Sequence, residues 1–178
     1  QWPVSYTING KTMRLGLRSL AYYDKVSKTL HPLSSFNSVT ATRQGNTLTY
    51  SNILPGVDVI YEYHKGSFRQ DIILNSMQSF FSPLQYQMSS ASYLVSVTEI
   101  DTTEFRSSLK DSFGQTLESG FLDGEGKDFY FSNPFTGKTL CYFAQSNAFN
   151  NSPDPTTRSL TMYKHLVQQN GHLYLVEG

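Results

Sequence analysis

With 178 residues, the chain is long enough for one well-filled core, and we expect a single domain over residues 1–178. Lysine plus arginine and aspartate plus glutamate number 14 each, so the chain lacks the net positive charge that attracts nucleic acid or an anionic membrane surface. Charged residues make up 16% of the chain, below the roughly 25% of an ordinary soluble domain, whereas serine and threonine supply 39 positions. We therefore expect any partner to be recognised by shape and local chemistry.

Aromatic residues are abundant, with twelve tyrosines and twelve phenylalanines. Bulky rings suit the half-buried surface of a sheet better than a helix, because a helical turn restricts their rotamers. Cys141 is the only cysteine, which excludes an internal disulfide. Its apolar neighbours Leu140, Tyr142 and Phe143 favour a buried strand residue over a reactive thiol.

The amino-terminal segment predicts a hairpin. Residues 4–8 form a strand-like run that ends at Asn9-Gly10, a dipeptide that readily adopts positive φ at both turn positions. Met13, Leu15 and Leu17 then alternate with polar residues, as in a half-buried strand.

Two further hairpins follow. Residues 39–43 and 47–50 flank a compact turn at 44–46, and the chain breaks at 52–56 before a strand over 57–63. Val57, Val59, Tyr61 and Tyr63 share one face of that strand, with Asp58, Ile60 and Glu62 on the other. His64-Lys65-Gly66 then turns the chain into a strand over 68–74.

The middle of the chain is less regular. Residues 75–92 are loop-like, with Pro83 interrupting any helix, and a strand is expected over 93–97. The best helix candidate is 101–111, where Asp101 or Thr102 could cap a short helix.

The last third predicts further antiparallel pairs. A strand at 129–131 turns at 133–137 and pairs with a strand through Phe143. We expect a surface loop over 147–157, which holds Pro153 and Pro155, and then strands over 159–166 and 173–176 around Asn170-Gly171.

Short strands separated by turns indicate an all-β, mainly antiparallel fold that is β-sandwich-like and has at most one short helix. No apolar run approaches the ~20 residues that span a bilayer, and no signal peptide is recognisable. Because the chain begins at Gln1 and ends at Gly178, we expect a domain excised from a larger protein.

Candidate chemistry is sparse. Of the four histidines, His31, His64, His165 and His172, only the last two approach metal-ligand spacing. A metal site needs a third ligand, and nothing nearby in the sequence supplies one. We therefore expect solvated or stacked histidines on a hairpin rather than metal ligands. No Gly-x-Ser-x-Gly elbow or phosphate-binding loop is present, and we expect no cofactor.

Two groups of carboxylates could have a chemical role beyond keeping the chain soluble. Asp58, Glu62 and Asp71 lie on paired strands and could supply the acid and base of a glycosidase, although cross-strand pairing with Lys65 and Arg69 is the simpler interpretation. The glycine-spaced acids Asp123, Glu125 and Asp128 are a weak calcium candidate, since they do not reproduce a twelve-residue calcium loop. A solvated hairpin tip is the alternative.

The most distinctive segment runs from 49 to 63 and continues from 66 to 74. It resembles a β-rich amino-terminal module of bacterial RHS and YD-repeat proteins and related large secreted or cell-surface proteins, in which a Pro-Gly-Val-Asp turn and strand precede a glycine turn. The match covers about 25 of 178 residues. The residues that carry it are Tyr50, Asn52, Pro55, Gly56, Asp58, Tyr61, Gly66, Asp71, Ile72 and Leu74, whereas Phe68-Arg69-Gln70 departs from the usual Val-Lys-Glu.

The resemblance implies an extracellular or cell-surface module without catalytic residues. The motif itself suggests a structural role, because Pro55 fixes φ, Gly56 permits the turn and Asp58 can accept hydrogen bonds from loop amides. We therefore expect a non-enzymatic module for assembly, packing or adhesion, whose partners are other domains of the same polypeptide or a surface protein or glycan. The alternatives are a carbohydrate-binding module that uses exposed aromatics such as Tyr22, Tyr23 and Phe135, and a glycan-active enzyme.

Overall fold

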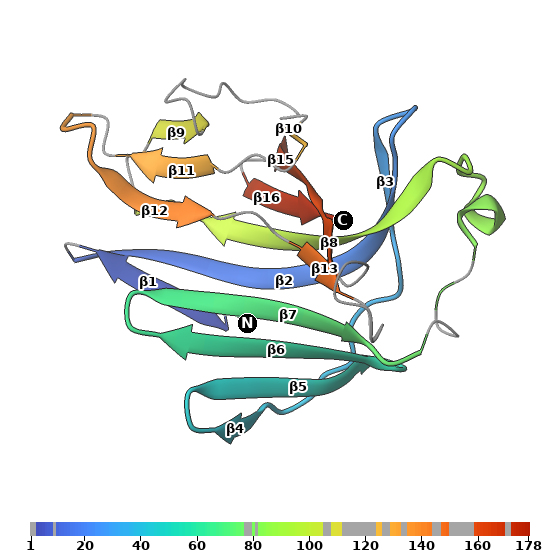
Figure 1. Ribbon diagram of the computed structural model, residues 1–178, viewed down its shortest axis with the longest axis horizontal. Coiled ribbons are helices and arrows are strands. Elements are labelled where there is room, and N and C mark those ends of the chain that lie inside the picture. The colour runs from blue at the N-terminus through green and yellow to red at the C-terminus, as the bar shows by residue number, and fades with distance from the viewer. Residues whose placement is uncertain are drawn as a thin grey trace. The chain divides into compact units, whose positions relative to one another are not determined.

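The computed structural model describes residues 3–8, 10–76, 80, 82–104, 108–111, 124–125, 129–132, 135–143, 147–149, 159–169 and 172–178. It divides into two compact units, one formed by Gln1–Ala21 with Tyr93–Gly178 and the other by Tyr22–Ser92. The strand pairs with a described register are all antiparallel (Figure 1). The all-β, mainly antiparallel class is confirmed.

A sheet with the strand order β1-β2-β8-β16-β15-β10 organises the first unit. Strand β2 continues into the second unit, which holds β3, a further partner of β2. These strands are β1 (Val4–Ile8), β2 (Lys11–Asp24), β3 (Thr29–Pro32), β8 (Ser92–Asp101), β10 (Gly124–Glu125), β15 (Tyr163–Gln169) and β16 (His172–Glu177). Figure 1 shows β2 and β8 as long neighbouring strands of this sheet.

Two smaller sheets also belong to the first unit. One has the order β12-β11-β9 and the other pairs β13 with β14. Their strands are β9 (Ser108–Asp111), β11 (Phe129–Ser132), β12 (Thr139–Phe143), β13 (Asn147–Phe149) and β14 (Ser159–Thr161). Phe131 packs its ring against Phe143 with centroids 5.8 Å apart.

Among its described residues, the second unit contains a four-stranded sheet, β4-β5-β6-β7, and a 3-10 helix. Its elements are β4 (Thr42–Gln44), β5 (Thr47–Leu54), β6 (Val57–His64), β7 (Ser67–Leu74) and η1 (Pro83–Tyr86). Val57, Val59 and Tyr61 of β6 are at most 2% exposed, while the alternate side chains are only half-buried. The predicted two-faced strand is therefore confirmed.

The hairpins predicted from turn chemistry are present. Ile8 pairs with Lys11 in the first, and Gly10 between them has a φ of +76°. Strand β11 pairs with β12, and β15 pairs with β16, as expected from their turn sequences.

The predicted helix over 101–111 is wrong. Asp101 is the last residue of β8, and Ser108–Asp111 forms β9, which pairs with β11. Asp101 does accept the backbone N–H of Thr103 at 3.0 Å, but this bond makes a turn after a strand. Sheet pairing with a distant segment thus overrides a local capping signal.

Three smaller expectations also need correction. Pro83 starts the 3-10 helix rather than only interrupting one, because its missing N–H costs nothing at a first helical position. Asn147–Phe149 is strand β13 rather than loop, while 150–157 lies outside the described residues. Tyr22 and Tyr23 are 6% and 1% exposed, so neither can offer a stacking surface.

Candidate functional site

The predicted motif forms the turn between β5 and β6. Leu54 pairs with Val57, so Pro55 and Gly56 are the two turn residues, and Gly56 has a φ of +75°. A Cβ on Gly56 would lie 2.9 Å from Cβ of Ser76, so the segment after β7 packs closely against this turn. Both backbone conformation and space therefore require glycine here.

A bulge in β5 creates the main polar feature of the motif. The register with β6 shifts between Tyr50 and Leu54, and Asn52 adopts a left-handed φ of +55°. Residues in such a bulge leave the regular ladder, so their backbone groups need other partners. Asn is one of the few residue types that tolerates this conformation.

Asp58 supplies one of these partners from the neighbouring strand. Its Oδ1 accepts the backbone N–H of Asn52 at 2.7 Å, and its Oδ2 accepts from Nδ2 of Asn75 at 2.9 Å. Asn37 completes the bulge, because its Nδ2 donates to the carbonyl of Asn52 at 3.0 Å. The carboxylate thus joins the start of β6, the bulge and the residue after β7.

The other motif residues support the same sheet. The rings of Tyr50 and Tyr61 meet edge to face, with centroids 6.0 Å apart. Gly66 has a φ of +83° and lies in the turn between β6 and β7. Tyr63 continues the face of Tyr61, and burial raises its pKa, with a further contribution from Tyr50.

Glu62 and Asp71 converge on one arginine. Nη2 of Arg69 lies 3.1 Å from Glu62, and Nε of Arg69 lies 2.9 Å from Asp71. Nε2 of His64 is 3.3 Å from the other oxygen of Glu62. Cross-strand pairing of Glu62 with Arg69 is therefore confirmed, whereas Asp71 contacts Arg69 along the same strand.

The two histidines of the last hairpin lie apart from one another along it. His165 pairs with Val176, is 1% exposed, and its Nε2 lies 3.0 Å from the hydroxyl of Tyr93. His172 starts β16 and contacts Glu99 instead. Among the residues that the structure describes, no group of three potential ligands could hold a metal ion.

The weak calcium candidate lies largely outside the described residues. Asp123 and Asp128 lie outside the described residues, and only the backbone of Glu125 is described. That backbone forms β10, in which Glu125 pairs with Tyr163 and Gly124 with Lys164.

Cys141 behaves as an interior residue of β12. It is partly buried, and burial raises the pKa of its thiol to about 11. Only a small fraction of thiolate is then present near neutral pH, which agrees with the prediction of an inert thiol.

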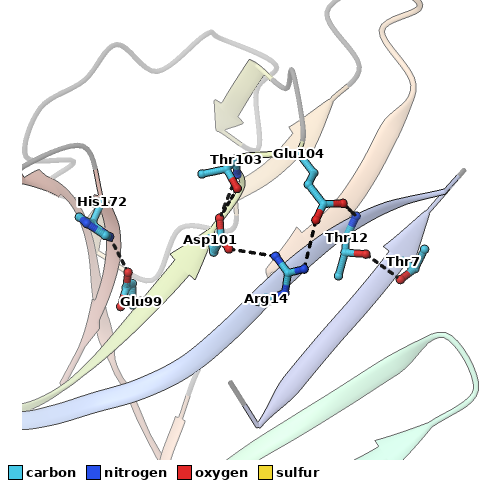
Figure 2. Close-up of polar contacts among 8 residues, drawn as sticks. All are labelled: Thr7, Thr12, Arg14, Glu99, Asp101, Thr103, Glu104 and His172. Atoms are coloured by element: carbon cyan, nitrogen blue, oxygen red, sulfur yellow. Dashed lines mark hydrogen bonds and ion pairs between the residues drawn. The ribbon is translucent and has the colours of Figure 1, made fainter. Parts of the chain in front are cut away.

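A second polar cluster was not anticipated from the sequence (Figure 2). The carboxylate of Glu99 on β8 accepts a hydrogen bond from Nε of Arg18 on β2 at 2.6 Å. Its other oxygen lies 2.6 Å from Nδ1 of His172 on β16. Glu99 is 8% exposed, so its charge needs these partners. The cluster therefore ties three strands of the first unit together.

A further set of polar contacts involves residues near the start of β2. Glu104 accepts the backbone N–H of Thr12 at 2.9 Å and Nη2 of Arg14 at 3.1 Å. Arg14 also reaches Asp101 at 3.2 Å, as Figure 2 shows. Hydrogen bonds from Thr12 and Arg14 lower the pKa of Glu104, and the bond from Thr103 is the largest cause of the lowered pKa of Asp101.

Asp24 is the corresponding buried acid of the second unit. Its Oδ1 accepts backbone N–H groups of Val26 and Ser27 at 2.8 and 3.2 Å, and its Oδ2 accepts that of Ser89 at 2.9 Å. These bonds, led by the one from Ser89, lower its pKa to about 2. The residue fixes a turn to the segment that follows the 3-10 helix.

No protein-family model matches the chain, and neither a curated protein nor a solved structure matches it. The resemblance to RHS and YD-repeat modules therefore stays a prediction. In the part of the chain that the structure describes, no helix is long and apolar enough to cross a membrane.

Proposed function

We propose that this chain is a non-catalytic structural and interaction module of a bacterial secreted or cell-surface protein, used in assembly, packing or adhesion. The observation that most supports this proposal is that the carboxylate of Asp58 is fully engaged in hydrogen bonds within the fold. Both of its oxygens accept hydrogen bonds that hold the β5 bulge and the end of β7. A carboxylate occupied in this way serves the fold rather than proton transfer to a substrate.

The other acids of the sheet give the same support. Glu62 and Asp71 both contact Arg69, so the carboxylates that we considered as a glycosidase pair are neutralised by one shared cation. A general acid needs a pKa raised by burial without a counter-charge. This arrangement favours the structural role over the enzymatic alternative.

The resemblance of the 49–74 segment to surface modules supports the extracellular location. Three of the residues that carry the resemblance, Asn52, Gly56 and Asp58, lie at the β5–β6 turn, where they have specific backbone or hydrogen-bonding roles. Such modules would act on neighbouring domains of their own polypeptide or on another surface protein. An absence of net charge agrees with recognition by shape.

Replacing Asp58 by alanine tests the structural role. The variant leaves the N–H of Asn52 and the side chain of Asn75 without their acceptor, so we expect a loss of about 1–3 kcal/mol in unfolding free energy. Asp71→Ala is the matched control, because it removes a carboxylate from an exposed ion pair worth about 0–1 kcal/mol. Unchanged unfolding of Asp58→Ala, or equal losses in both variants, would contradict the proposal.

A carbohydrate-binding module is the second candidate. Phe135 in the turn between β11 and β12 is 82% exposed, and Tyr142 of β12 is 54% exposed. Exposed rings are the usual stacking surfaces for sugars. Binding on a glycan array that is lost in both Phe135→Ala and Tyr142→Ala, but retained in Val26→Ala, would favour this candidate.

A further inference from the structure

Strand β7 lies at one edge of the four-stranded sheet. The strand order is β4-β5-β6-β7, and all eight residues of β7 pair with β6. In the described residues, no strand pairs with the outer edge of β7. Ile73 and Leu74 near its end are 39% and 41% exposed. A long edge strand with exposed apolar residues is a template for pairing with another strand.

The register with β6 shows which backbone groups point outward. His64 and Ser67 close the turn, and at the other end the N–H of Asn75 donates to the carbonyl of Gly56 at 2.7 Å. Hydrogen-bonded positions alternate along an antiparallel pair, so the backbone N–H and C=O groups of the odd-numbered residues of β7 bond to β6. Phe68 and Ile72 are even-numbered, so their backbone N–H and C=O groups face the outer edge.

The sequence of β7 is complementary to itself when it is reversed. We propose that β7 pairs antiparallel with β7 of a second copy of this chain, setting Arg69 of each copy opposite Asp71 of the other. In this register Phe68 also lies opposite Ile72, and both residues direct their backbone groups into the new pair. The contact is isologous and closes as a dimer. This inference deepens the proposed interaction module and rests on it.

Charge selects this register over its neighbours. If the two-fold axis shifts by one residue in one direction, Arg69 lies opposite Arg69, and in the other direction Asp71 lies opposite Asp71. Like charges directly opposite one another destabilise a strand pair, whereas opposite charges stabilise it. Only the proposed register therefore gives two favourable charge pairs.

The same charges discriminate against other strands. Arg69 and Asp71 lie on one face of β7 and already contact one another, with Nε of Arg69 2.9 Å from Asp71. Their side chains are 64% and 32% exposed, so both remain accessible to a strand at the edge. Charged residues on an edge strand disfavour pairing with an unmatched sequence. A second copy supplies the matching pattern.

Sedimentation velocity of the full chain at low salt, over a range of concentrations, tests the proposal. One strand pair makes a small interface, so we expect weak dimerisation. The fraction of dimer should rise with protein concentration and fall as salt is added. Arg69→Asp and Asp71→Arg should each raise the dimer dissociation constant about tenfold or more, because each places like charges opposite one another twice. An equimolar mixture of the two variants should form a heterodimer, since every charge then faces its opposite.

A measurement on the unmodified chain keeps the test independent of how the variants fold. Amide exchange of Phe68 and Ile72 should slow as concentration rises, while that of Tyr61 on the central strand β6 should not. Monomeric behaviour at every concentration, or a mixture of the two variants that does not associate, would overturn the self-pairing. Neither result affects the proposed structural role of Asp58, which is read from the unfolding of the monomer.

Discussion

Replacing Gly56 by alanine should destabilise the second unit by about 1–5 kcal/mol, with a central value of about 3 kcal/mol. The φ of +75° costs an alanine about 1–2 kcal/mol, because Cβ then approaches the following carbonyl. The new Cβ also lies 2.9 Å from Cβ and 3.3 Å from the backbone N of Ser76, and relieving such overpacking costs about 1–3 kcal/mol. A stiffer unfolded chain offsets about 0.4–1 kcal/mol of this.

Gly66→Ala is the matched control for that prediction. Gly66 has a similar φ of +83° and occupies the equivalent place in the next turn, but a Cβ there meets no heavy atom within 4 Å. We expect a loss of only about 0.5–1 kcal/mol, so the difference between the variants isolates the contact with Ser76.

Urea unfolding followed by circular dichroism gives both values from midpoints and slopes. A Ser76→Gly background removes the Cβ of Ser76 and should recover part of the loss in Gly56→Ala, while leaving Gly66→Ala unchanged. If Gly56→Ala is no more destabilising than Gly66→Ala, the close packing of the turn against Ser76 is refuted.

Three further predictions concern single groups. The pKa of Asp24 is about 2, below the ~3.9 of an unfolded aspartate, so its stabilisation is complete above about pH 4 and is lost as the pH falls towards 2. The Asp24→Asn variant should therefore lose less stability than the unmodified chain between about pH 4 and 2, and parallel urea midpoints would contradict this. Cys141, with its pKa of about 11, should react slowly with a thiol reagent near pH 8 and rapidly after unfolding; labelling of the native chain at the unfolded rate would refute its burial. Glu104→Gln keeps an acceptor for the N–H of Thr12 and Glu104→Ala does not, so the amide of Thr12 should exchange faster in the alanine variant, and equal rates would count against that bond.

Turn chemistry made much of the β-structure predictable. A glycine that follows Asn, Pro or Lys at a strand end specifies its hairpin locally, as Gly10, Gly56 and Gly66 do with positive φ. The role of Asp58 was predictable for the same reason, since its partner Asn52 lies only six residues away.

Contacts between distant segments were not predictable. The bonds of Glu99 to Arg18 and His172 join residues 81 and 73 positions apart, and the strand order that brings them together has no local signature. Alternation along β2 does place Arg14 and Arg18 on the same side, which indicates a charged surface but not its partners. The expectation that Tyr22 and Tyr23 are exposed was wrong for a related reason. Both faces of β2 are buried at that end, so burial does not alternate along the strand there.

Amide hydrogen exchange at Asn52 tests the central claim most directly, namely that Asp58 serves the turn. In the unmodified chain the N–H of Asn52 should be protected by its 2.7 Å bond to Asp58, although it lies in a bulge outside the regular ladder. In Asp58→Ala this amide should lose far more protection than that of Tyr61 on β6, which should change only with global stability. An unprotected Asn52 amide in the unmodified chain, or equal changes at both positions, would contradict the account.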